Sequence, residues 1–197
     1  MANSDAKGFK LYKKGDGNSA EPISLRYRAA NSATLKVGDA VRINTSGFLV
    51  RSGTTAPVLG VLEAFEDSKG ISPLSLIHAN NTGATFTNDD TVATASDNQT
   101  RTDNYIVGVV AFDPDGSCLY YNDADGDLAT TNLMQMFDVA AAASNQISAS
   151  SASEANGQWQ LILIDPDNDG DASKGLFRIA ESQLSTGVDS ATAKVAA

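Results

Sequence analysis

Cysteine and histidine are nearly absent from this chain of 197 residues, which contains one of each. A single cysteine, Cys118, excludes an intrachain disulfide and a zinc site built from several cysteines. A single histidine, His78, leaves a Ser-His-Asp triad only one position for its base, and no Gly-x-Ser-x-Gly motif accompanies it. Glycine-rich phosphate loops of the two common patterns are also missing. We therefore expect a binding or structural protein and not an enzyme.

Long apolar runs are missing as well. None approaches the length of about eighteen residues that a membrane-spanning helix requires. Residues 1–7 are polar and show no apolar stretch of the kind found in signal peptides. The sequence thus predicts a protein that is made and folded in a cytoplasm and has no membrane partner.

Glutamate is scarce, and the abundant residues are Ala, Ser, Thr, Asn, Asp and Gly. Surface helices usually draw on Glu and Lys, whereas turns and short strands draw on the residues that are plentiful here. Apolar residues make up 42% of the chain, which is enough for a packed core and argues against wholesale disorder. Composition therefore favours a β protein.

The net charge of −10 is unevenly distributed. Residues 1–51 contain nine Lys and Arg against four Asp and Glu, a balance of +5, whereas residues 52–197 contain five against twenty, a balance of −15. An acidic body repels nucleic acid and anionic membranes, so we expect neither as a direct partner. The basic start is suited to an acidic protein surface.

Alternating apolar and polar side chains at residues 23–28 indicate a half-buried strand. Residues 40–43 and 48–51 flank Asn44-Thr45-Ser46-Gly47, which predicts a hairpin. Further strands are expected at 58–65, 74–77, 105–112, 118–121, 159–164 and 176–179.

Three stretches are less clear. Residues 79–103 contain few large apolar groups and predict a long loop with one weak strand near 91–95, where the domain could divide into two subdomains. Residues 144–157 also predict a loop. The Met and Ala content of 133–143 favours a helix, but its alternation suits a strand, which we prefer because its surroundings are β.

Short strands separated by turn residues predict an all-β fold, an antiparallel β-barrel or β-sandwich. Residues 1–21 are expected to form an extended N-terminal arm with a short edge strand, and 22–181 the β domain. Residues 182–197 are small and polar and predict a flexible C-terminal tail.

One motif has the spacing of a metal site. Asp165, Asp167 and Asp169, followed by Gly170, match the opening of a calcium loop, in which alternating carboxylates converge on one cation. The twelfth position should be Glu but is Leu176, and the preceding residues predict a strand, so this is not an EF-hand. A surface turn whose Asp side chains cap their own backbone explains the motif equally well.

Between residues 34 and 180 the chain shows a succession of short motifs: 34–41, 47–51, 58–65, 118–121, 125–128, 136–139, 157–166 and 175–180. In these motifs it resembles the decoration (cement) proteins of tailed-phage capsids. The resemblance implies a small β-barrel or β-sandwich that binds the outside of the assembled head, commonly as a homotrimer over threefold junctions of the major capsid protein. It also implies a location on the capsid exterior and no cofactor.

With this resemblance, the basic arm is the segment expected to lie on the capsid, where it could add a strand to a sheet edge of the capsid protein. The candidate capsid-binding residues are Lys7, Lys10, Leu11, Tyr12, Lys13, Lys14, Arg26 and Arg28.

A second hypothesis is a calcium- or glycan-binding β module, such as a head-fibre or adhesin domain. It rests on the Asp165–Asp171 loop and on three aromatic residues, Tyr120, Tyr121 and Trp159, whose rings would have to be exposed. Trp159 is equally suited to the core.

Overall fold

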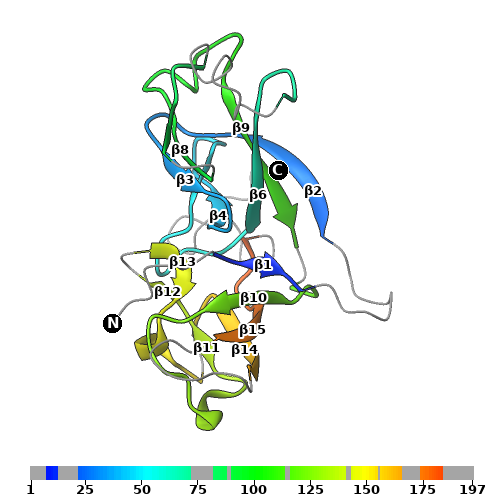
Figure 1. Ribbon diagram of the computed structural model, residues 1–197, viewed down its shortest axis with the longest axis vertical. Helices are drawn as coiled ribbons and strands as arrows, with labels where there is room; N and C mark the ends of the chain where they lie inside the picture. The colour runs from blue at the N-terminus through cyan, green and yellow to red at the C-terminus, as the bar shows by residue number, and fades with distance from the viewer. Residues whose placement is uncertain are drawn as a thin grey trace.

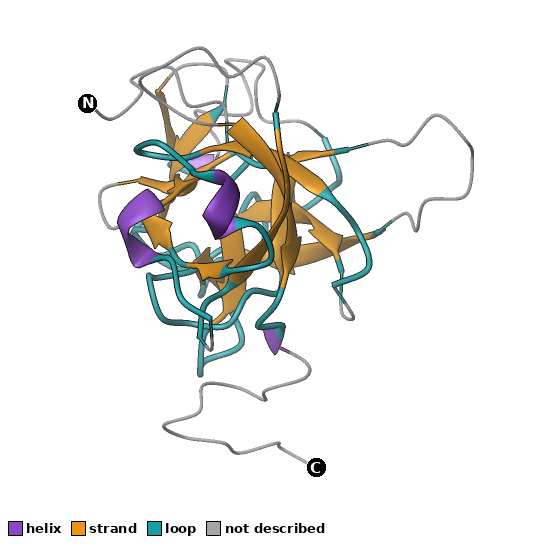
Figure 2. Cartoon of the chain, turned by 90° about the horizontal axis from the view of Figure 1, so that it is seen from below, coloured by secondary structure: helices purple, strands orange, loops and turns teal. Residues whose placement is uncertain are grey.

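The computed structural model describes residues 8–12, 22–71, 82–87, 90–113, 116–140, 143–154, 156–165 and 174–183. Within them the chain forms two main antiparallel sheets, one in each half of the molecule (Figure 1). Strands, loops and only short helical turns make up the molecule in Figure 2. The expected all-β fold is confirmed, although the strands do not form a closed barrel.

The upper sheet has the order β2-β9-β6-β4-β5 and the lower sheet the order β1-β10-β15-β14-β11. The upper strands are β2 (Ile23–Arg28), β4 (Ala40–Ile43), β5 (Leu49–Arg51), β6 (Gly60–Asp67) and β9 (Ile106–Phe112). The lower strands are β1 (Lys10–Leu11), β10 (Tyr120–Asp123), β11 (Met136–Phe137), β14 (Trp159–Ile164) and β15 (Lys174–Ile179).

Smaller elements complete the fold. A three-stranded sheet and a two-stranded sheet flank the main sheets, and two 3₁₀ helices are present in the described residues. Their members are β3 (Thr34–Lys36), β7 (Thr85–Thr87), β8 (Thr91–Ala93), β12 (Val139–Ala140), β13 (Ala143–Ile147), η1 (Thr130–Asn132) and η2 (Ala149–Ser151).

The structure corrects two of the expected loops. β8 is the weak strand expected near 91–95, but β7 also lies within residues 79–103, and β13 and η2 lie within 144–157. Each region contributes one fully buried apolar side chain, Val92 and Ile147 respectively. A single apolar residue among small polar ones gives no periodic pattern in the sequence. Pairing with a neighbouring strand is nevertheless enough to make such a segment a strand. Residues 133–143 include the strands β11 and β12, as preferred, while the strand expected at 74–77 lies outside the described residues.

Strands β4 and β6 serve both halves of the molecule. Ala40 and Val61 belong to the lower core, whereas their neighbours Val41 and Leu62 belong to the upper core. Successive side chains of a strand point to opposite faces, so the upper sheet has a core on each side. The two cores therefore share these strands and do not divide at 79–103.

Two buried glutamines tie the halves together. Gln158 donates from Nε2 to the Oγ of Ser52 (3.0 Å) and to the carbonyl oxygen of Gly53 (2.7 Å). Gln183 donates to the carbonyl oxygen of Ile43 (2.7 Å) and accepts from its backbone N–H (2.9 Å). Ser182 and Gln183 are buried, so the first two residues assigned to the C-terminal tail belong to the folded domain.

Residues 8–12 belong to the folded domain as well, although they were assigned to the arm. Phe9 is 3% exposed, and its ring stacks on Trp159 with the centroids 3.9 Å apart. Its backbone N–H donates to the carbonyl oxygen of Gly38 (2.9 Å). Gly8 has a φ of 78°, and a Cβ there would lie 2.7 Å from the Cα of Gly38, so this approach requires glycine. β1 is the short edge strand expected in this region.

Replacing Phe9 by alanine is expected to lower the free energy of unfolding by about 3–5 kcal/mol, because it empties a large buried site. Urea denaturation of the purified chain measures this. The control is Tyr12→Ala, three residues away in the same segment, where the side chain is 44% exposed and the loss should stay below about 1 kcal/mol. Equal losses for the two variants would contradict the docking of this segment through Phe9.

Two carboxyl groups near Gln158 have perturbed pKa values. Burial raises the pKa of Glu181, and the nearby charge of Asp138 raises it further. Burial also raises the pKa of Asp138, against a hydrogen bond from the backbone of Gln158 that lowers it. At neutral pH both groups are ionised, and keeping these partly buried carboxylates charged lowers the free energy of unfolding.

We expect Glu181→Gln to raise the melting temperature at neutral pH and to leave it unchanged in acid below the ordinary Glu pKa. Because the folded pKa lies above the unfolded one, the folded state binds more protons between the two values, and wild-type stability falls as pH rises through that interval. Thermal unfolding across a pH series tests this, with the exposed Glu154→Gln as the control. A lower melting temperature of Glu181→Gln at neutral pH would refute it.

Candidate interaction surface on the lower sheet

The register of four strands in the lower sheet separates a buried row of side chains from an outward row. Residues directly opposite one another in antiparallel strands point to the same face. The buried row consists of Leu11, Tyr120, Phe177 and Leu161, and the next row, on the opposite face, consists of Lys10, Tyr121, Leu176 and Leu163. Neighbouring strands are about 4.8 Å apart, so the outward row crosses roughly 14 Å of surface.

Leu163 reaches the outward row because β14 contains a bulge. The register of β14 against β15 shifts between Leu161 and Leu163, so Ile162 is an extra residue. Leu163 is consequently 51% exposed although it lies within the most apolar segment of the chain. Gly175 on β15 accommodates the bulge, because a Cβ there would lie 2.8 Å from the carbonyl oxygen of Leu163.

A hollow of about 180 Å³ lies at one end of this row. The Tyr121 hydroxyl donates to the Oδ2 of Asp165 at 2.5 Å. The structure thus brings Tyr12, expected to bind a capsid, beside Asp165, expected to bind a metal. The hollow is lined by Tyr12, Tyr121, Leu163, Asp165, Gly175 and Leu176.

We define the outer face as the outward-pointing residues of β1, β10, β14 and β15 together with Tyr12 and Asp165. It combines exposed apolar groups with a small excess of positive charge. Tyr12 and Leu163 supply the exposed apolar groups. Three cations against two carboxylates give a balance of +1 on a chain whose net charge is −10; these groups are Lys10, Lys174, Arg178, Asp123 and Asp165.

A turn beside β14 adds two further exposed apolar side chains, Leu133 and Met134. The backbone N–H of Met134 donates to the carbonyl oxygen of Leu161 (2.9 Å), which fixes the turn against the sheet. Met134 has a φ of 69°, a conformation that costs energy for a residue with a Cβ. Four of the six exposed large apolar side chains among the described residues therefore belong to the lower sheet or to this turn.

The expected capsid-binding residues are divided among several places. Lys10 and Tyr12 lie on the outer face, whereas Leu11 packs against the lower core. Arg26 and Arg28 lie on β2 of the upper sheet. Lys7, Lys13 and Lys14 lie outside the described residues.

The two arginines have internal partners. The Nε of Arg26 lies 2.6 Å from a carboxylate oxygen of Glu66. Arg28 donates to the carbonyl oxygens of Asn98 (2.8 Å) and Arg101 (2.5 Å) and lies over the ring of Tyr105. Arg28 therefore helps to fix the loop after β8 to the upper sheet.

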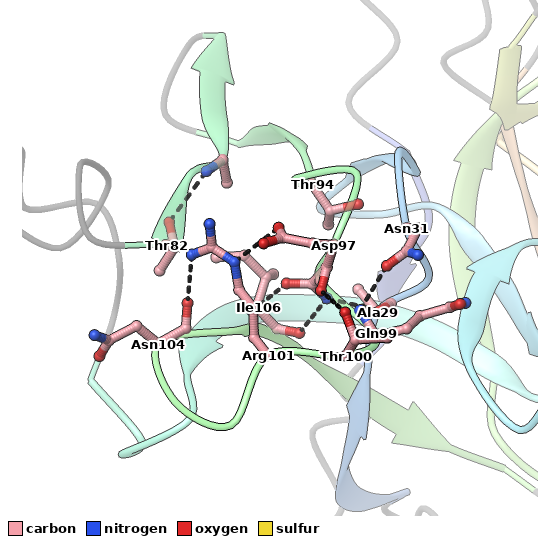
Figure 3. Close-up of polar contacts among 12 residues, drawn as sticks. Ala29, Asn31, Thr82, Thr94, Asp97, Gln99, Thr100, Arg101, Asn104 and Ile106 are labelled. Carbon is pink, nitrogen blue, oxygen red and sulfur yellow. Dashed lines mark hydrogen bonds and ion pairs between the residues drawn. The ribbon is translucent and has the colours of Figure 1, made fainter.

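That loop is held by its own network of polar contacts, shown in Figure 3. Arg101 pairs with Asp97 at 2.8 Å, and the Oδ1 of Asn31 accepts from the backbone N–H of Gln99. The buried amide of Asn98 donates to the carbonyl oxygen of Ala29 (2.7 Å). These contacts within the chain hold the loop in its conformation, so no bound ligand is needed to explain that conformation.

Of the three aspartates predicted to bind a metal, the structure describes only Asp165. Asp165 is bound by the Tyr121 hydroxyl, while Asp167 and Asp169 lie outside the described residues. In the part of the chain that the structure describes, no three acidic, histidine or cysteine side chains converge as metal ligands would.

Two of the three aromatic residues proposed for glycan binding are buried, which corrects that expectation. Trp159 and Tyr120 are 0% exposed, and their rings meet edge to face in the lower core. Only Tyr121, which lies in the outward row, is half-buried. Alternation along β10 places adjacent tyrosines on opposite faces.

Sequence reasoning missed Leu163 and Lys174 as exposed members of a surface, and Leu176, which is 8% exposed, as part of the lining of the hollow. The apolar run from Trp159 to Ile164 indicates a fully buried strand, and nothing in it announces a bulge. The glycine at 175 is the only signal of the close backbone approach.

Gly175→Ala is expected to lower the free energy of unfolding by about 1–3 kcal/mol, because the added methyl group would clash with backbone at the bulge. Urea denaturation again measures the change. Gly53→Ala is the matched control, since a Cβ at Gly53 meets nothing within 4 Å. If both variants unfold at the same urea concentration, the bulge does not depend on Gly175.

Comparison with protein-family models, curated proteins and solved structures finds no match to this chain. Among the described residues, no helix has the length and apolar content needed to cross a membrane.

Proposed function

We propose that this chain is a capsid decoration protein, which binds the major capsid protein on the outside of a tailed-phage head and stabilises the shell. The observation that carries the proposal is the outer face of the lower sheet. It presents exposed apolar side chains beside Lys10, Lys174 and Arg178 on an otherwise acidic chain. The sequence motifs that resemble decoration proteins support it independently.

The contact follows from the chemistry of the face. Tyr12 and Leu163 provide apolar area whose burial favours association. The cations complement an acidic protein surface and speed its encounter with the chain. Lys7, Lys13 and Lys14 flank β1 in the sequence and add positive charge to the same segment.

Stabilisation of the shell follows from mass action. A protein that binds assembled capsid subunits and not dissociated ones shifts the equilibrium toward the assembled state. The homotrimer that the resemblance implies would present three outer faces to neighbouring subunits, and such linkage raises the overall affinity without new contacts. In this proposal the role is structural and not catalytic.

The calcium- or glycan-binding alternative has less support. It loses Trp159 and Tyr120 to the core, and its remaining candidate is the hollow between Tyr12, Tyr121 and Asp165. That hollow is part of the outer face, so the proposed capsid contact would cover it.

The test is co-sedimentation with empty heads of the phage that encodes the chain. The wild type should sediment with the heads, and Leu163→Asp should bind at least about tenfold more weakly, because a charge buried at a contact costs more than 1.4 kcal/mol. Raising the salt concentration should also weaken binding.

The control is Ile71→Asp, which makes the same change at a 44% exposed side chain outside the lower sheet and should bind like the wild type. A wild type that stays in the supernatant would reject the capsid function. Equal binding of Leu163→Asp and wild type would instead reject the outer face as the contact.

A further inference from the structure

β2 is the outermost strand of the upper sheet, and one of its edges is open. The backbone N–H of Ala29 donates to the carbonyl oxygen of Ile106 (3.1 Å), its direct partner in the register. Hydrogen-bonded and non-bonded pairs alternate along an antiparallel ladder, so Tyr27, Leu25 and Ile23 also bond to β9.

The backbone groups of Ser24 and Arg26 consequently point away from β9. No described segment pairs with them. Such an edge is a template for another strand, and proteins usually cover it or protect it.

The open stretch is limited at both ends. Pro22, like Ser24, directs its backbone away from β9, but it has no N–H to donate to an added strand. At the other end the edge is already used, because Ala29 forms a parallel bridge with Leu49 and the N–H of Ala30 donates to the carbonyl oxygen of Leu49 (2.9 Å). Ser24 and Arg26 thus each keep an outward N–H and carbonyl, and at the two ends the carbonyl of Pro22 and the N–H of Arg28 also point outward.

We infer that β2 pairs with β2 of a second copy of this chain, antiparallel and about a twofold axis at Leu25. In this register Ser24 of each copy lies opposite Arg26 of the other. Each such pair exchanges two hydrogen bonds, so the outward backbone groups of Ser24 and Arg26 on both copies are satisfied. The two five-stranded sheets become one continuous sheet.

The side chains fit the same register. On one face Leu25 packs on its symmetry mate, and Ile23, which is 63% exposed, lies opposite Tyr27 of the other copy, an apolar–aromatic cross-strand pair. On the other face the Ser24 hydroxyl donates to Glu63 at 2.9 Å. Arg26 of the second copy therefore approaches a carboxylate, and the charges are complementary.

Neighbouring registers are worse. An axis at Arg26 places two arginines directly opposite each other, and like charges there are destabilising. An axis at Ser24 places Arg26 opposite Pro22, which offers no N–H. If the pairing slips by one residue, the outward backbone groups of one copy lie opposite residues of the other copy whose backbone groups already bond to β9. The twofold contact goes beyond the proposed function, since a threefold arrangement contains no such isologous pair.

Cysteine cross-linking tests the register. The axis brings the two Leu25 Cα atoms to about 4.5 Å, within the range for a disulfide. Leu25→Cys should form a dimer on a non-reducing gel under mild oxidation, in a Cys118→Ala background. Ile23→Cys is the control, because the two copies of this position lie about 13 Å apart along the strands and should not cross-link.

Sedimentation equilibrium tests the contact without a cross-link. The wild type should approach twice its mass of 20.5 kDa, or six times that mass where the threefold contact of the proposed homotrimer also forms. Ser24→Pro should weaken the dimer by about tenfold or more, because each copy leaves one carbonyl of the ladder unpaired. The fold should survive, since proline is tolerated where the N–H points away from the sheet, and circular dichroism checks this.

Leu25→Lys, which sets two cations opposite each other, is the second variant, with Ile71→Lys as its control. A wild type that stays monomeric at every concentration would overturn the inference. A larger assembly that Ser24→Pro leaves intact, or a Leu25→Cys chain that does not cross-link, would overturn it as well.

Discussion

The stacking of Phe9 on Trp159 is the interaction on which the proposed surface depends. It anchors the N-terminal segment in the lower core, and β1 then pairs with β10. That pairing places Lys10 and Tyr12 on the outer face while Leu11 points inward. A basic segment that the sequence presents as a loose arm is therefore partly a fixed edge of the sheet, and its backbone is already ordered before a partner binds, which lowers the entropic cost of association.

The fold gives this surface a rigid support. Because β4 and β6 contribute side chains to both cores, movement of one half would disturb packing in the other. Gln158 and Gln183 add buried hydrogen bonds across the same junction, and breaking them would leave unsatisfied polar groups. The outer face and the open edge of β2 lie on different sheets, so the proposed capsid contact and the inferred pairwise association would use separate surfaces.

Much of the fold follows from local sequence. Alternation and turn residues predict β2, the β4–β5 hairpin, β9, β14 and β15 close to their observed limits. β8 is expected as a weak strand, but β7 and β13 are not, although each pairs with a strand close in sequence, β8 and β12 respectively. Ile147 is the one large apolar side chain of β13 that is fully buried. Composition cannot report such pairing, because β propensity mostly reflects the neighbours that a strand meets.

The candidate site was less accessible to sequence reasoning. Charge and aromaticity predict Lys10 and Tyr12 as binding residues, but Leu11 between them faces inward, and Arg28 holds a loop in place. Leu163 is exposed only because of a bulge, which the run of apolar residues conceals. Asp165 is predicted from its spacing with two aspartates outside the described residues, and the structure places it against the Tyr121 hydroxyl.

Lysine footprinting on head-bound and unbound protein tests the central claim most directly. Acetylation by a small reagent reports the accessibility of each ammonium group, and the exposed Lys69, in the turn after β6, serves as the internal reference. We predict that Lys10 and Lys174 lose reactivity when the chain binds heads, while Lys69 keeps its reactivity. Protection of Lys69 with Lys10 and Lys174 unchanged would show that a different surface faces the capsid.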